Sequence, residues 1–285
     1  MISEKIIDKA SKILKNKKIH SHEIDAQLIL SDIMKVKREY LIINNKKQIP
    51  KKIKKKYAIA INRRAKKEPI AYITGKKEFW SEDFLVNYKT LIPRPETELL
   101  IYKVVSFFKN KKINILDIGT GSGCILLSIL KELNFSRGIG IDISSQAVQM
   151  ARKNSINLRL SNRSKFKIID LNKFNTGKFD LIVSNPPYII SRDIKKLSKD
   201  IINYEPLQAL DGGIDGLDLI KKVIYKSSHL LKREGLLALE IGRNQYRKVS
   251  DILKSNGYRE ISKVYDNGVN VRCIISTKVK FFKIK

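Results

Sequence analysis

The sequence predicts an α/β protein with a doubly wound, mostly parallel sheet, preceded by a small N-terminal helical bundle. From residue 113 onward, short apolar runs alternate with segments whose apolar residues recur at helical spacing. That alternation is typical of a parallel sheet covered by helices on both faces. The first 67 residues show only helical spacing, and residues 68–92 are rich in aromatic and turn residues. We therefore expect a helical domain at 1–67, a linker with a hairpin at 68–92, and an α/β domain at 93–285.

The N-terminal part is expected to form a bundle of helices with a basic exterior. Apolar residues recur at helical spacing in three stretches, residues 6–14, 24–33 and 53–61. Ser21 precedes His22 and Glu23, the arrangement of a helix N-cap followed by an acid in the first turn. The first 67 residues hold 20 basic and 6 acidic residues, a net charge of +14.

The linker begins where Glu68-Pro69 ends the last of these helices, and its turn residues predict a short hairpin. The run Pro93-Arg94-Pro95 then interrupts the chain. Glu96 and Glu98 follow in the first turn of a helix that is expected to reach about residue 110. These two carboxylates either cap that helix or approach the cationic group of a ligand.

The α/β domain is predicted from its alternating segments. Strands are expected at residues 113–118, 138–143, 166–169, 181–183, 236–241, 258–265 and 269–277. Helices are expected at residues 122–133, 144–157, 217–231 and 245–255. The last two strands have no helix between them, so we expect them to add an antiparallel strand at one edge of the sheet.

Composition narrows the function without deciding it. No apolar run approaches the roughly 18 residues that a membrane-spanning helix needs, and the first five residues do not resemble a signal peptide. Two cysteines, Cys124 and Cys273, make a disulfide framework or a cysteine-based zinc site improbable, so we expect a reduced, cytoplasmic protein without a metal. The net charge is +30, but lysines outnumber arginines by 44 to 14, which is weak evidence for specific nucleic-acid recognition.

The first candidate site is a glycine-rich loop between a predicted strand and a predicted helix, with the sequence Asp117-Ile118-Gly119-Thr120-Gly121-Ser122-Gly123. Glycines let the backbone approach a ligand, and the amides at a helix N-terminus face it. A dinucleotide fingerprint would need Gly or Ala at the sixth position counted from Gly119, where this chain has Cys124. A ligand without a pyrophosphate therefore fits this loop better.

Acids at the ends of the predicted strands indicate the class of ligand. Asp142 lies 23 residues beyond Gly119, where a carboxylate accepts hydrogen bonds from ribose hydroxyls, and Asp170 ends the third strand. Acids at the ends of the first two strands, Asp117 and Asp142, favour a positively charged nucleoside, and S-adenosylmethionine is one. The predicted cofactor-binding residues are Gly119, Thr120, Gly121, Ser122, Gly123, Asp142, Asp170, Leu171 and Asn185.

The second candidate site is Asn185-Pro186-Pro187-Tyr188, directly after an apolar strand. The side-chain oxygen of Asn185 and the carbonyl of Pro186 can both accept hydrogen bonds from one planar NH2 group, and Tyr188 offers a flat face. Two such acceptors raise the electron density of an amide nitrogen and aim it at a methyl donor. We therefore predict Asn185, Pro186 and Tyr188 as catalytic residues, and Asn185 to Tyr188 as the substrate-binding segment.

With these motifs, the sequence resembles the protein-(glutamine-N(5)) methyltransferases of class I peptide-chain release factors, the HemK or PrmC family. The resemblance also includes the segments Glu68 to Gly75, Phe79-Trp80, Leu91 to Glu98, Tyr204-Glu205-Pro206 and Leu210 to Gly213. It implies a class I S-adenosylmethionine-dependent methyltransferase fold, which is Rossmann-like. The implied substrate is the glutamine of a release factor's Gly-Gly-Gln motif, whose methylation modulates translation termination. The N-terminal domain would dock the release factor.

One position departs from the family, and two other functions stay open. Family members often have an aromatic residue beside adenine where this chain has Leu171. The main alternative is an amino-group methyltransferase acting on DNA or ribosomal RNA, which the charge favours but which usually carries a substantial recognition module. The other is a basic adaptor with a degenerate cofactor fold. Arg272 is either structural or in contact with the substrate.

Overall fold

The computed structural model describes residues 2–279. The chain divides into two compact units, of which the first comprises Met1–Lys76 with Leu197–Tyr204 and the second Lys77–Lys196 with Glu205–Lys285. Both candidate sites belong to the second unit. The short segment Leu197–Tyr204 therefore belongs to the first unit although it follows the Asn-Pro-Pro-Tyr motif in the chain.

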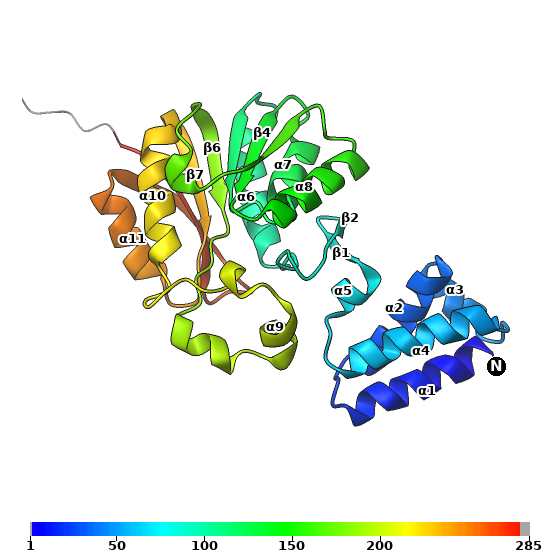
Figure 1. The fold of residues 1–285 in the computed structure, drawn as a ribbon. Coiled ribbons are helices and arrows are strands. Elements are labelled where there is room, and N and C mark those ends of the chain that lie inside the picture. Colours follow the sequence, from blue (N-terminus) through cyan, green and yellow to red (C-terminus); the bar gives the residue numbers. More distant parts are fainter. Residues whose placement is uncertain (1, 280–285) are drawn as a thin grey trace, which may run out of the picture. The chain divides into compact units, whose positions relative to one another are not determined.

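The first unit is helical, as expected (Figure 1). Its helices are α1 (Ser3–Asn16), α2 (His22–Met34), α3 (Arg38–Ile43), α4 (Lys51–Ala65), α5 (Ile70–Thr74) and α9 (Lys199–Tyr204). Its core is formed by fully buried side chains such as Leu14, Ile29, Leu30 and Tyr57. The Tyr204 hydroxyl, at the end of α9, donates a hydrogen bond to the Lys66 carbonyl over 3.0 Å.

Three details of this unit differ from expectation. Helices α3 and α5 were not predicted, because five or six residues are too few to show a helical repeat. Ser21 occupies the N-cap position of α2, but its side chain makes no cap hydrogen bond. Its hydroxyl instead donates to Asp25 over 2.9 Å, and the same carboxylate oxygen pairs with Arg64 at 2.6 Å. An ion pair with α4 thus replaces the predicted cap.

The second unit begins with the hairpin β1 (Lys76–Phe79) and β2 (Glu82–Leu85), whose first residue lies at the border of the two units. Trp80 and Ser81 form its turn, with φ angles of 52° and 58°. Both central residues of a two-residue type I′ turn have positive φ. The backbone N–H of Trp80 donates to the Glu98 carboxylate over 2.8 Å, so Glu98 holds the hairpin turn.

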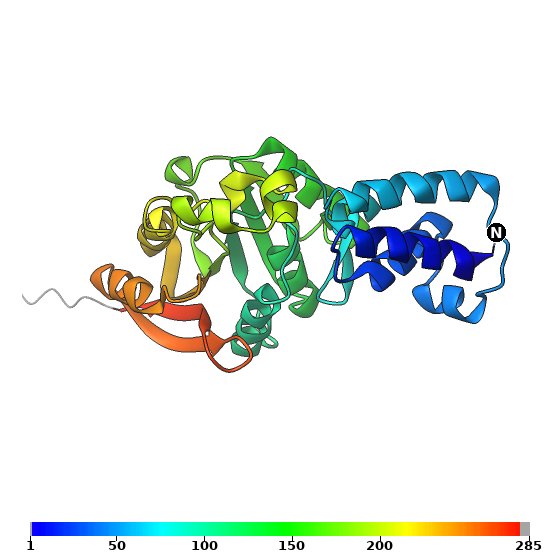
Figure 2. The same ribbon diagram turned by 90° about the horizontal axis from the view of Figure 1, so that it is seen from below.

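A sheet forms the centre of the second unit (Figures 1 and 2). Its seven strands have the order β5-β4-β3-β6-β7-β9-β8. The strands are β3 (Asn114–Ile118), β4 (Arg137–Asp142), β5 (Ser164–Ile168), β6 (Phe179–Ser184), β7 (Leu231–Glu240), β8 (Tyr258–Tyr265) and β9 (Val271–Lys278). Strands β3 to β7 are parallel, whereas β9 is antiparallel to both β7 and β8. The final pair therefore lies at one edge of the sheet and adds an antiparallel strand there, as predicted. Within the pair, the antiparallel β9 is the inner strand and β8 the outermost.

Helices cover both faces of this sheet (Figure 1). Helices α6 (Thr97–Phe108), α7 (Cys124–Glu132) and α8 (Ser145–Asn157) share one apolar cluster, and α10 (Asp218–Leu230) and α11 (Tyr246–Ser255) share the other. Successive residues of β3 alternate between them, because Ile115 joins the first cluster and Leu116 the second. Among the two cysteines, Cys273 is buried and Cys124 half-buried.

Helix α7 begins two residues later than predicted, at Cys124, because Gly123 has a φ of 81° and cannot belong to it. Strand β7 begins five residues earlier than predicted. Strands β3, β4, β6 and β7 end at Ile118, Asp142, Ser184 and Glu240, so their carboxyl ends meet at one edge of the sheet. Ligand sites of open α/β sheets lie at that edge.

Candidate active site

The glycine loop after β3 leaves its backbone open to a ligand. Gly119 and Gly121 have φ angles of 72° and 55°, values that favour glycine. A Cβ atom added at Gly119 would meet nothing within 4 Å, and one at Gly121 would meet only the Gly119 carbonyl, at 4.0 Å. The amides of Gly119 and Thr120 both donate to the Ile141 carbonyl, over 2.9 and 3.0 Å, which anchors the loop to β4.

The end of the same loop packs against α8 instead. A Cβ atom added at Gly123 would lie 3.1 Å from the Cβ of Ala151. The Ser122 carbonyl accepts a hydrogen bond from Asn154 Nδ2 over 2.9 Å, and Asn154 also bonds both backbone groups of Leu85 in β2. Gly119 and Gly121 are therefore the glycines that border open space, whereas Gly123 permits close packing.

Asp142, at the end of β4, holds the loop from the side. Its carboxylate accepts hydrogen bonds from the Gly121 amide over 3.0 Å and from the Ser144 amide over 2.9 Å. Burial raises the pKa of Asp142, and these amide donors lower it. The structure thus brings Asp142 and the glycine loop together, as a shared cofactor site requires.

Asp117, the one acid of β3, belongs to the first candidate site but was not included among the predicted cofactor-binding residues. It is fully buried, and its Oδ2 accepts a hydrogen bond from the Thr120 hydroxyl over 2.6 Å. Its Oδ1 has no hydrogen-bond partner among the described residues. Burial raises the pKa of Asp117 to about 7. A buried carboxylate oxygen without a donor favours a cationic group nearby, so these residues fit the sulfonium and ammonium groups of S-adenosylmethionine.

Asp170 and Leu171 lie after β5. Asp170 is exposed, and its carboxylate accepts a hydrogen bond from the Asn172 amide over 2.7 Å, which caps the 3₁₀ turn η1 (Leu171–Lys173). The Leu171 side chain is 7% exposed and belongs to the apolar cluster of α10 and α11. Most of Leu171 therefore packs in the core, and only a small part of it faces outward.

The Asn-Pro-Pro-Tyr motif follows β6 and is held from several sides. Asn185 Nδ2 donates to the Thr97 hydroxyl over 3.2 Å. Gln245 Nε2 donates to the Tyr188 carbonyl over 3.0 Å and to the Gly216 carbonyl over 3.1 Å. Pro186 is buried, and Pro187 and Tyr188 are half-buried. The segment is therefore braced by α6 and by the residues that open α11.

A buried carboxylate lies behind this motif. Glu240, the last residue of β7, has no exposed surface and accepts hydrogen bonds from the Thr97 hydroxyl over 2.6 Å and the Tyr188 hydroxyl over 3.4 Å. Arg272 Nη2 lies 3.1 Å from the Tyr188 hydroxyl and 3.7 Å from Glu240 Oε1. Burial raises the pKa of Glu240, and the bond from Thr97 and the charge of Arg272 lower it.

Sequence reasoning missed Thr97 and Glu240, and left Arg272 unassigned. A signal for Glu240 was available, because it is an acid within the apolar run of residues 236–241. An acid is rarely buried without a partner. Another buried acid, Glu205, accepts a hydrogen bond from Arg94 over 2.6 Å. This bond ties the Pro-Arg-Pro segment to the residues just before η3 (Leu207–Ala209).

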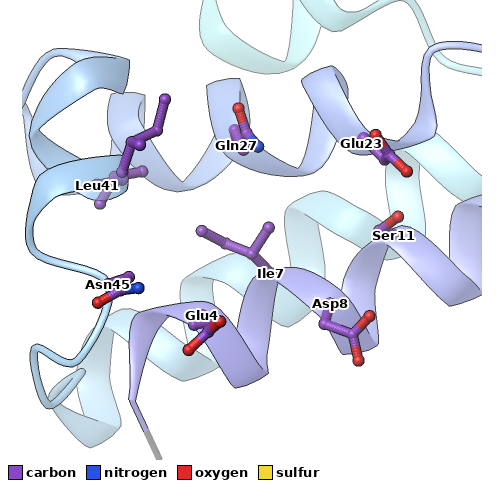
Figure 3. A pocket seen from close by; sticks show the side chains of 9 residues that line it. Glu4, Ile7, Asp8, Ser11, Glu23, Gln27, Leu41 and Asn45 are labelled. Carbon is purple, nitrogen blue, oxygen red and sulfur yellow. The ribbon is translucent and has the colours of Figure 1, made fainter.

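The first unit has a pocket of its own, of about 330 Å³, between α1, α2 and α3 (Figure 3). Its apolar residues include Ile7 and Leu41. Glu4, Asp8 and Glu23 also line it, half of the six acids in residues 1–67. The exterior of this unit is therefore not uniformly basic.

Comparison with known proteins identifies the family. Residues 5–75 match the model of the PrmC N-terminal domain, and residues 109–270 match a methyltransferase domain. The chain is 40% identical over 257 residues to a release factor glutamine methyltransferase of Clostridium acetobutylicum, covering 89% of this chain and 90% of that protein. It is 41% identical to the protein of that name from Buchnera aphidicola subsp. Schizaphis graminum, with 89% and 92% covered. The chain belongs to the release factor glutamine methyltransferase family.

The protein is thus an S-adenosylmethionine-dependent methyltransferase, and solved structures agree on its fold. A methyltransferase from Pyrococcus furiosus has a TM-score of 0.52 at 19% identity, covering 70% of this chain and 89% of that one. The catalytic domain of hMettl16, solved with an RNA hairpin, has a TM-score of 0.57 at 17% identity, covering 79% and 82%. These likenesses concern the fold alone. Among the described residues, no helix is long and apolar enough to span a membrane.

Proposed function

We propose that this protein transfers a methyl group from S-adenosylmethionine to the side-chain amide nitrogen of the glutamine in the Gly-Gly-Gln motif of class I peptide-chain release factors. The observation that carries the proposal is the orientation of Asn185. Its Nδ2 is engaged by Thr97, which leaves Oδ1 as the acceptor that a substrate amide needs. Methylation there would modulate translation termination.

The cofactor is proposed to lie along the carboxyl ends of β3 and β4. Bound S-adenosylmethionine supplies a methyl group on a positively charged sulfur. Asp117 faces its positive charge, and Asp142 accepts from the ribose hydroxyls while it holds the Gly121 amide. Further residues proposed to contact it are Gly119, Thr120, Ser122, Gly123, Asp170, Leu171 and Asn185.

The substrate amide is proposed to lie at the Asn-Pro-Pro-Tyr motif. Asn185 Oδ1 and the Pro186 carbonyl accept its two N–H bonds, which fixes the nitrogen and raises its electron density. Pro187 keeps the loop rigid, and the Tyr188 ring covers the planar amide. An alkylated amide nitrogen is acidic enough to lose its proton to water, so no dedicated base is required.

The rest of the chain is proposed to present the release factor. Residues 1–67 dock it, residues 68–92 connect the two parts, and residues 93–285 carry the methyltransferase site. Because release factors act on the ribosome, we place the enzyme in the cytoplasm. Its activity requires no nucleic acid, although a net charge of +30 favours non-specific binding to polyanions.

Methyl transfer from labelled S-adenosylmethionine tests the proposal on three substrates in parallel. These are a class I release factor, the same factor with its Gly-Gly-Gln glutamine changed to alanine, and a mixture of DNA and ribosomal RNA. We expect label on the first substrate alone. Label on the nucleic acid alone would replace the proposal with the nucleic-acid alternative, which has the same Asn-Pro-Pro-Tyr logic and which the charge favours.

A further inference from the structure

Two chains of hydrogen bonds end on the Glu240 carboxylate. In one, Asn185 Nδ2 donates to the Thr97 hydroxyl, and Thr97 donates to Glu240 Oε2. In the other, Arg272 Nη2 donates to the Tyr188 hydroxyl, and Tyr188 donates to Glu240 Oε1. The first and last residues of the Asn-Pro-Pro-Tyr motif therefore both connect to one acid, Asn185 through Thr97 of α6 and Tyr188 directly.

The direction of the first chain determines which atom Asn185 presents. An ionised carboxylate only accepts hydrogen bonds, so the Thr97 hydroxyl must use its single proton toward Glu240. Toward Asn185, Thr97 is then only an acceptor, and the amide must turn its Nδ2 to Thr97. Asn185 Oδ1 is left on the opposite side. If Glu240 were protonated, it could donate to Thr97, Thr97 could donate to Asn185 Oδ1, and the amide would turn over.

Burial protects these hydrogen bonds from water. Glu240 has no exposed surface and Thr97 is 2% exposed, so water cannot replace either partner. Arg272 supplies a positive charge 3.7 Å from the carboxylate and is itself partly buried. The Tyr188 hydroxyl is held between them, and the guanidinium carbon lies 5.6 Å from the centre of the Tyr188 ring.

We propose that Glu240, acting through Thr97, is the positioning residue that keeps the Asn185 amide oxygen turned toward the substrate. The inference rests on the proposed function, because it assigns the polarity of the same substrate site. Glu240 and Thr97 touch neither substrate nor cofactor in this account. They select one of the two orientations that the nearly symmetric Asn185 amide can adopt.

Three variants test this positioning role. Thr97→Val keeps the shape of the side chain but removes the hydroxyl, and we expect kcat to fall about 10- to 100-fold, the cost of a misplaced reacting group. Thr97→Ser keeps the hydroxyl and should restore most of the activity. The affinity for S-adenosylmethionine, measured by calorimetry, should stay within a few-fold in both. Ser276→Ala is the matched control, because it removes a fully buried hydroxyl that has no partner among the described residues.

Glu240→Gln tests the same chain from its other end and covers the case in which Thr97→Val fails to fold. A glutamine can donate to Thr97, so the Asn185 orientation is no longer enforced and kcat should fall. The dependence of kcat on pH at saturating cofactor separates this role from a structural one. In the wild type, kcat should fall at low pH as Glu240 becomes protonated. In the Glu240→Gln variant, this fall of kcat at low pH should be absent. Charged or titratable groups around Glu240 are Arg272, Tyr188, Glu96, Cys124 and Cys273.

The outcomes separate the two proposals. A wild-type enzyme that leaves the release factor unlabelled would overturn the proposed function. An active wild type with Thr97→Val at full kcat, or with Thr97→Ser as impaired as Thr97→Val, would overturn the positioning role alone. A Glu240→Gln enzyme whose kcat falls at low pH as in the wild type would also overturn the positioning role.

Discussion

The Thr97 hydroxyl and the Glu240 carboxylate lie 2.6 Å apart, although 143 residues separate them in the chain. Thr97 is the first residue of α6 and Glu240 the last of β7, so this bond joins the Pro-Arg-Pro-Glu-Thr-Glu segment to the carboxyl edge of the sheet. Asn185 bonds to the same hydroxyl. The segment that introduces α6 is therefore part of the support of the substrate site.

Asn185→Ala should lower turnover strongly and leave the affinity for S-adenosylmethionine within a few-fold, because most of the proposed cofactor contacts come from other residues. The variant removes one of the two acceptors proposed to hold the substrate amide. Loss of one preorganised hydrogen-bonding group at a reacting centre costs about 100- to 1,000-fold in kcat. Single-turnover methylation of the release factor measures this loss, and calorimetry measures the affinity for S-adenosylmethionine. Nearly normal turnover would remove the amide-holding mechanism.

Asp142→Ala should have the opposite pattern and mainly weaken cofactor binding. The change removes the proposed ribose acceptor and also releases the Gly121 amide, which Asp142 holds at 3.0 Å. Hydrogen bonds to charged groups contribute about 1.5 to 3 kcal/mol, so the dissociation constant should rise about 10- to 100-fold. Saturating cofactor should restore most of kcat. An unchanged dissociation constant would contradict the assignment of Asp142.

Asp117 should make cofactor affinity depend on pH. Burial raises the pKa of its carboxyl to about 7, and a cationic ligand favours the ionised form. Affinity should therefore rise as the pH increases from 6 to 8, with proton release on binding near pH 7. Without cofactor, the free energy of unfolding depends on pH in the opposite direction. The folded protein keeps the Asp117 proton up to about pH 7, whereas the unfolded chain loses it at about pH 4. Stability of the free enzyme should fall across that range.

Asp117→Asn supplies the control for this pH dependence. The asparagine cannot ionise, so its affinity for S-adenosylmethionine should be weaker at pH 8 and flat between pH 6 and 8. Its melting temperature without cofactor should lose the decline that the wild type shows toward neutral pH. Titration calorimetry in two buffers of different ionisation enthalpy measures the released protons. A wild-type affinity that does not vary with pH would show that Asp117 does not face the cation.

Two glycines of the loop should fail in different ways when changed to alanine. Gly121→Ala adds a methyl group that no described atom meets closer than 4.0 Å, so the fold tolerates it except for the cost of a φ of 55°. Its main effect should be loss of cofactor affinity. Gly123→Ala forces a methyl group to within 3.1 Å of Ala151, so its main effect should be a lower melting temperature. Equal effects of both variants on cofactor affinity and on melting temperature would contradict the assignment of Gly121 to the ligand side of the loop and of Gly123 to its packing against α8.

If the basic charge of the N-terminal domain docks the release factor, salt should raise KM for the release factor. Electrostatic contacts between exposed charges weaken as the screening length falls from about 10 Å at 0.1 M to about 3 Å at 1 M salt. Changing the exposed Lys51, Lys52 and Lys55 of α4 to glutamine should reduce that salt dependence. The matched control changes the exposed Lys109, Lys111 and Lys112 of the second unit. A KM insensitive to salt would make the charge a by-product of composition.

The presence of strands β3 to β7 in a parallel sheet was predictable because buried parallel strands are uninterrupted apolar runs separated by helices. The order of the strands in the sheet was not predicted. The order within the final pair was not predictable, because nothing in its sequence says which strand pairs with β7. Strand β9 takes the inner place and β8 the edge. The glycine loop and Asp142 were predicted together because both follow parallel strands, whose carboxyl ends meet.

The residues that hold Asn185 could not be predicted from the sequence, because they are distant from it in the chain. Thr97 is a common helix residue, and only the folded chain brings it to Glu240 and Asn185. Arg272 is similar, since its contact with Tyr188 spans 84 residues of chain. Trp80 and Ser81 illustrate the same limit, because a tight turn gives positive φ angles to residues that rarely adopt them.

Methyl transfer is proposed to take place on an amide nitrogen held by Asn185. Mass spectrometry of the peptide that contains the Gly-Gly-Gln motif tests it most directly, after reaction of a release factor with wild-type enzyme and with Asn185→Ala at saturating S-adenosylmethionine. We expect one added methyl group on the glutamine side-chain nitrogen with the wild type, and almost none with the variant although it still binds cofactor. A methyl group on another residue, or equal methylation by both enzymes, would contradict it.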